Sequence, residues 1–123
     1  AITAEPLTPG PITAMIIGSI GAVIMYYGTK LLENFGLDDV VGAIPVHMFA
    51  GIFGTLVVPL TNADTSFGTQ LIGVISVCVF SFVLSWITFS TLKSTVGLRI
   101  SRAAEKQGTD KAEVGVIAYS IRD

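Results

Sequence analysis

Three long apolar runs constrain this chain more than any other feature of its sequence. They span residues 11–32, 40–60 and 67–92. At 1.5 Å per helical residue, each run is long enough to cross a hydrocarbon core of about 30 Å. The alternative, buried helices of a soluble protein, conflicts with composition, because only 13% of the residues are charged and soluble domains carry about 25%. The sequence therefore predicts an all-α membrane protein with three transmembrane helices.

Residues at the ends of these runs fit helix starts and stops. Pro11 suits a first helical turn, where its missing N–H is not needed. Asp38 or Asp39 can cap the start of the second run, and Lys93 closes the third. We therefore expect a transmembrane region over residues 1–93.

Residues 94–123 form a polar tail, in which a short helix is expected near Ser101–Gln107 with a stop at Gly108. The tail, together with Lys93, holds six of the seven Lys and Arg residues, and Lys30 is the seventh. Short spacers make neighbouring spans antiparallel, which places Lys30 and the tail on one side of the membrane. The positive-inside rule makes that side cytoplasmic, so a multi-pass protein of the cell (inner) membrane is expected.

His47, the only histidine, lies inside the second apolar run. At helical spacing its neighbours are small: Ala43, Ala50, Gly51 and Gly54. Small residues mark close helix packing in membranes, whereas ionisable residues at that depth face a bundle interior or a cavity. The residues alone leave two interpretations open, a pore histidine and a packing histidine. A metal site is disfavoured, because no Cys, Asp or Glu accompanies His47 on its face.

Enzymatic chemistry finds no support in the sequence. No glycine-rich phosphate loop, Ser–His–Asp set or spaced carboxylate pair is present. We expect neither an enzyme nor a cofactor, and no nucleic-acid partner.

The run "DDVVGAIPVHMFAGIFGTL" resembles the signature around the second pore histidine of the ammonium transporter family, which includes the Rhesus-type proteins. "AITA" at residues 1–4, "GTKLLENFGLDD" and the tail run "STVGLRISRAAEKQGTDKAEVG" resemble further family segments in the same order. The resemblance covers essentially the whole chain. Its signature positions here are Asp38, Asp39, Gly42, Ala43, Val46, His47, Gly51, Gly54 and Thr55.

The resemblance implies an eleven-helix fold in two inverted halves, assembled as a trimer with one pore per subunit. Two side-by-side histidines would line each pore and help ammonium to lose its proton, and His47 matches the second of them. Ala43, one turn earlier, matches a pore-facing position. Because His47 is the only histidine, we expect this chain to correspond to the last three helices and the tail, with N-terminal helices missing.

The tail keeps part of the family pattern, at Gly108, Asp110, Gly115, Ala118 and Tyr119, while Val114 and Val116 replace the family's His and Glu. The resemblance implies a regulatory tail that can meet a PII-type signal protein. A second hypothesis treats the chain as a small membrane interaction module, or a non-conducting remnant, that associates with full-length subunits.

Overall fold

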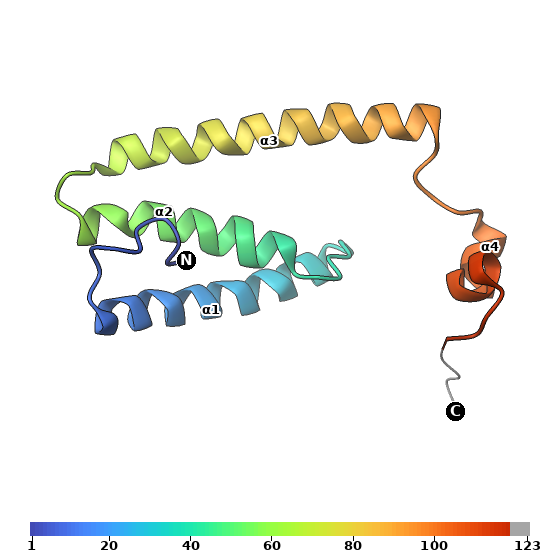
Figure 1. Cartoon of the computed structure of the whole chain (residues 1–123), viewed down its shortest axis with the longest axis horizontal. Helices are drawn as coiled ribbons and strands as arrows, with labels where there is room; N and C mark the ends of the chain where they lie inside the picture. Colours follow the sequence, from blue (N-terminus) through green and yellow to red (C-terminus); the bar gives the residue numbers. More distant parts are fainter. Residues whose placement is uncertain (119–123) are drawn as a thin grey trace. The chain divides into compact units, whose positions relative to one another are not determined.

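The computed structural model describes residues 1–118, and most of each apolar run is helical (Figure 1). Three helices are long and apolar enough to cross a membrane. The protein is therefore an all-α membrane protein, as its sequence predicts. The described helices are α1 (Pro11–Asn34), the π-helix η1 (Ile44–Phe49) that continues into α2 (Ala50–Thr61), α3 (Phe67–Thr95), α4 (Arg102–Gln107) and the π-helix η2 (Asp110–Val114).

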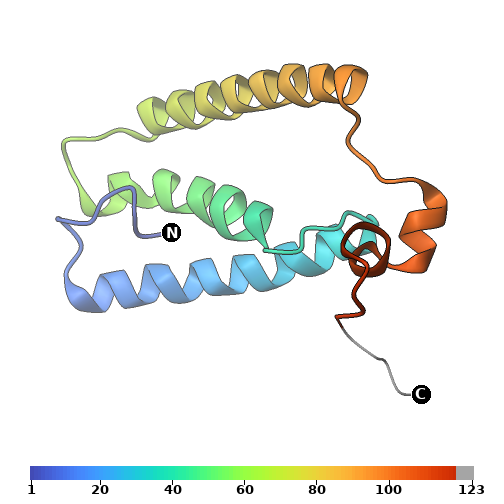
Figure 2. The ribbon, with the colours of Figure 1, turned by 45° about the vertical axis from the view of Figure 1, so that its right-hand side comes forward.

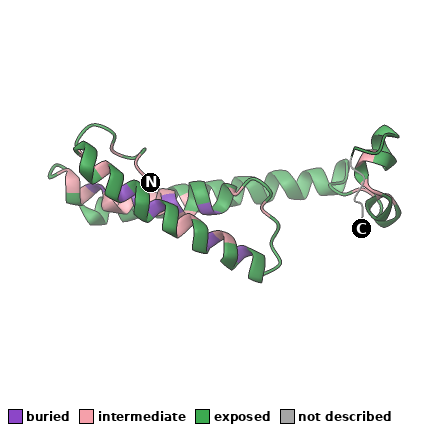
Figure 3. Ribbon diagram, turned by 90° about the horizontal axis from the view of Figure 1, so that it is seen from below, coloured by how far each residue is buried: buried purple, intermediate pink, exposed green. Residues whose placement is uncertain are grey.

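The chain divides into two compact units, Ala1–Phe80 and Ser81–Asp123. In the first unit, α1 runs beside η1 and α2, and both ribbon views show the pair together (Figure 2). The few residues that are buried within residues 1–118 lie on these helices (Figure 3). Among the described residues, α3 has none that is buried, so its apolar surface is open to lipid or to further protein.

Gly36 ends α1, just before the loop that leads to the second span. The N–H of Gly36 donates to Glu33 O and the N–H of Leu37 donates to Leu32 O, with Gly36 at a φ of 67°. This is a Schellman motif, in which a left-handed residue lets the chain bond back to the last helical carbonyls. α1 thus extends two residues beyond the expected end of the first run.

Small residues allow α1 and the second span to approach closely. A Cβ added at Gly28 would lie 2.6 Å from Phe49 Cδ2 and 3.1 Å from Pro45 Cβ. Pro45 is fully buried at this contact, and Ala50 is only 5% exposed. Without a hydrophobic drive between helices in lipid, such close backbone contact is a main source of their association.

The second span differs from expectation at its start. Helical geometry over Ile44–Thr61 begins four residues later than the apolar run, because Gly42 adopts a φ of 67°, which lies outside the helical region. The first turns are then a π-helix. Pro45 has no N–H to continue a regular ladder, and its carbonyl accepts from the Ala50 N–H five residues on.

In the second unit, α4 begins at a Ser101 cap whose side chain accepts from the Ala104 N–H at 3.2 Å. It ends at Gly108, which has a φ of 98°. The short tail helix and its stop are therefore where the sequence predicts them.

Candidate functional site

His47 lies in η1, on a surface that the described chain leaves open. Ala43 precedes it by about one turn and is also exposed, and Gly51 follows by about one turn. A Cβ added at Gly51 would meet nothing within 4 Å. We call Ala43, His47 and Gly51 the histidine face. The imidazole therefore stands beside free space, with one donor and one acceptor nitrogen in its neutral form.

The small-residue stripe expected around His47 divides into two faces. Ala50 is buried, and Gly54 is buried against the N-terminal segment, where an added Cβ would collide with the backbone of Ala1. The prediction that these two residues share a face with His47 is wrong. The π-helix changes the register between His47 and Ala50, a change that a regular helical projection cannot anticipate.

The acidic pair before the second span provides a helix cap. Asp39 Oδ1 accepts from the Ala43 N–H at 2.9 Å, and Asp39 Oδ2 accepts from the Ile44 N–H at 2.7 Å. Both bonds satisfy donors that a helix start leaves without internal partners. Asp38 is exposed and takes no hydrogen bond within the described residues. Asp39 thereby holds the residues that lead into the histidine face.

The N-terminal segment is attached to the far end of α2. Glu5 Oε2 accepts from Asn62 Nδ2 at 2.8 Å, and its Oε1 accepts from the Leu7 N–H at 3.4 Å. The Asn62 hydrogen bond is the main cause that lowers the pKa of Glu5 below its ordinary value. This connection between residues far apart in sequence carries no local signal, and sequence reasoning missed it.

Two of the tail residues that the sequence singles out, Gly108 and Asp110, lie in a compact turn. Asp110 Oδ2 accepts from the Ala118 N–H at 2.8 Å, and this bond is the main cause that lowers the pKa of Asp110. Gly108 lies beside the same carboxylate, since a Cβ there would approach Asp110 Oδ1 to 2.7 Å. Tyr119, the third expected tail residue, lies outside the described residues. Within residues 1–118, no group of His, Cys, Asp and Glu could hold a metal ion.

These features define a class, a multi-pass α-helical membrane protein with an ionisable ring beside open space in a spanning helix. Comparison with protein families is more specific, because the Ammonium Transporter Family matches residues 1–119. The chain belongs to that family.

Individual relatives agree with this assignment. Ammonium transporter Amt2 of Archaeoglobus fulgidus is 36% identical over 97% of this chain. Ammonium transporter Amt1 of Methanocaldococcus jannaschii is 35% identical over 89% of it, and an ammonium transporter of Corynebacterium glutamicum is 30% identical over 98%. The chain spans 30% of the length of each of these relatives.

Proposed function

We propose that this chain supplies the last three membrane helices and the tail of an ammonium transporter, with the histidine face lining the path of ammonium or ammonia. The observation that carries the proposal is the position of His47, open to its surroundings on a spanning helix whose opposite surface packs on α1. An ionisable ring facing lipid is costly, so such a ring is expected to face a protein-lined path.

His47 is proposed as one of two pore histidines, the other coming from helices outside this chain. Its ring can exchange a hydrogen bond with the passing substrate, and Ala43 and Gly51 leave room for that substrate beside the ring. Three helices enclose only part of a path, so transport requires the rest of a subunit. Assembly of complete subunits as a trimer is part of the same proposal.

The orientation proposal rests on charge. Spans joined by short loops are expected to alternate in direction, so Lys30 and the basic tail would share one side, and the positive-inside rule would make that side cytoplasmic. We propose the cell membrane as the location and the tail as the segment that would meet a PII-type signal protein.

Methylammonium uptake by the complete transporter tests the role of His47. A hydrogen bond to a charged group contributes about 1.5–3 kcal/mol, so His47→Ala is expected to change uptake about tenfold or more, or to change its pH dependence. Met48→Ala is the matched control, because Met48 is a neighbouring exposed residue of the same π-helix. Unchanged uptake and pH dependence in a normally inserted His47→Ala protein would refute the proposal and favour the interaction-module hypothesis.

A further inference from the structure

The second span contacts α1 at a spacing that a regular α-helix does not allow. Pro45 is fully buried, and its Cβ would lie 3.1 Å from a Cβ added at Gly28. Ala50 is 5% exposed, and its Cβ would lie 3.9 Å from a Cβ added at Gly21. Gly21 and Gly28 are about two turns apart and share one side of α1. Pro45 and Ala50 therefore both face α1, although they are five residues apart in sequence.

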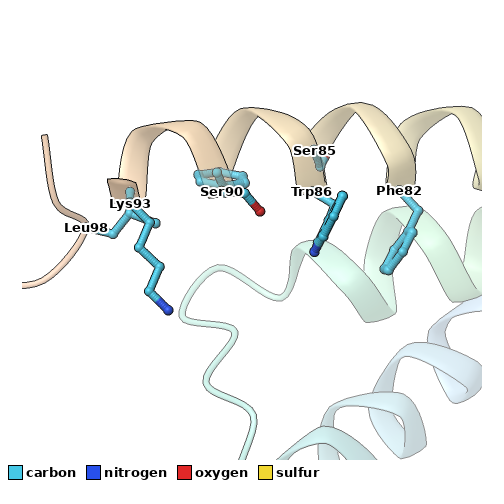
Figure 4. Close-up of a pocket in the computed structure, with 7 residues that line it drawn as sticks. Phe82, Ser85, Trp86, Ser90, Lys93 and Leu98 are labelled. Carbon is cyan, nitrogen blue, oxygen red and sulfur yellow. The ribbon is translucent and has the colours of Figure 1, made fainter. Parts of the chain in front are cut away.

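Five residues of a regular α-helix rotate by about 500°, which is about 140° past a full turn. The regular helix α3 shows the usual spacing, since Phe82, Trp86 and Lys93, successively four and seven residues apart, project from one side of it (Figure 4). The second span reaches its five-residue spacing through the π-helix η1, in which the Ala50 N–H donates to the Pro45 carbonyl. A bond to the fifth residue back takes up one extra residue in the turn.

That extra residue determines which way His47 faces. Counted back from Ala50 along a regular α-helix, His47 would lie about 60° from the direction of α1, and Met48 about 160° from it. In the structure, Pro45 occupies the place against α1 and His47, two residues further on, is exposed. Two residues rotate a helix by roughly half a turn, so the imidazole lies on the side away from α1.

We infer that the π-helix positions His47 for transport, by turning its ring out of the α1 contact and toward the path. This inference rests on the proposed function of His47. Pro45 is a positioning residue in this arrangement, because it contacts α1 at Gly28 and acts on the path only through the direction of the ring. π-turns within α-helices frequently occur at functional sites, and this one carries the only ionisable side chain within the second span.

Deleting one residue tests the inference, because it brings Pro45 and Ala50 to the four-residue spacing of a regular helix while both still face α1. The residue removed then determines which side chain lies opposite α1. Deletion of Val46 puts Met48 there and leaves His47 about 100° from Pro45. Deletion of Met48, the matched control, keeps His47 two residues after Pro45 and therefore opposite α1.

Methylammonium uptake is measured over a range of pH in the complete transporter, at equal amounts of inserted protein and beside His47→Ala. We expect deletion of Val46 to change uptake about tenfold and to give the pH profile of His47→Ala. Deletion of Met48 is expected to keep the uptake and pH profile of the parent protein. Within the Val46 deletion, His47→Met together with Met48→His returns an imidazole to the side away from α1 and is expected to restore both.

The outcomes separate this inference from the proposed function. Equal uptake in the two deletions, or no recovery when the imidazole is returned, would overturn the inference, and the proposed function would stand if His47→Ala still changes uptake. Failure of the Met48 deletion to insert would also overturn the inference, since that variant is expected to keep both contacts with α1. Unchanged uptake and pH dependence in His47→Ala would refute the proposed function and the inference together.

Discussion

The glycines of α1 allow a matched test of how the first unit is held together. Gly28 is buried, and a Cβ there would lie 2.6 Å from Phe49 Cδ2 and 3.1 Å from Pro45 Cβ. Gly18 lies on the same helix with nothing within 4 Å of an added Cβ. Alanine at the two positions therefore makes the same chemical change, once into a packed contact and once into open space.

The expected magnitudes follow from that difference. Overpacking a close contact costs about 1–3 kcal/mol, and replacing glycine by alanine within a helix gains about 0.5–1 kcal/mol. Gly28→Ala should therefore destabilise the unit, by up to about 2.5 kcal/mol. Gly18→Ala should stabilise it by about 0.5–1 kcal/mol.

Unfolding in mixed micelles measures both effects. Each variant is titrated with sodium dodecyl sulfate in dodecyl maltoside, and helix loss is followed by circular dichroism. We expect the midpoint of Gly28→Ala to move to less sodium dodecyl sulfate and that of Gly18→Ala to move to more or stay unchanged. Coincident midpoints for the two variants would refute the packing of α1 on Phe49 and Pro45.

Two further predictions concern the ends of the second span. Asp39→Ala removes the acceptor for two backbone N–H groups and should lower the free energy of unfolding by about 1 kcal/mol. The control Asp38→Ala should change it little in the same sodium dodecyl sulfate titration. Equal losses in the two variants would contradict the cap. Asn62→Ala removes the main hydrogen bond that lowers the pKa of Glu5. The pKa of Glu5, measured by carboxyl NMR, should therefore rise toward its ordinary value of about 4.3. An unchanged pKa would exclude the contact between Glu5 and Asn62. A lowered carboxyl pKa stabilises the folded protein above its ordinary pKa, and this stabilisation is lost as the pH falls through the lowered value. Protection of the N-terminal segment from amide exchange should therefore decrease in acid and persist at neutral pH.

Apolar run length predicted the three spans, because a membrane-crossing helix has to satisfy its own backbone and remain apolar for its full length. The Ser101 cap and the Gly108 stop were also predictable, since both act through local backbone geometry. The acidic pair at the second span indicated a cap, but only the structure distinguishes Asp39 from Asp38.

The face of the second span was not predictable from regular helical spacing. Pro45 and the positive φ of Gly42 place a π-helix at its start, and this separates His47 from Ala50 and Gly54. Contacts between distant segments, such as that of Glu5 with Asn62, depend on how the chain folds back. No local pattern contains that information.

Thiol modification of the histidine face tests the central claim most directly. In a complete transporter that carries Cys78→Ser, Ala43→Cys places a reactive thiol one turn from His47. Ala22→Cys, an equally small change at an exposed position of α1, is the control. If the histidine face lines the path, a methanethiosulfonate reagent will block methylammonium uptake through Ala43→Cys, saturating ammonium will slow the block, and Ala22→Cys will be unaffected. Full uptake after confirmed modification at Ala43→Cys would contradict the account.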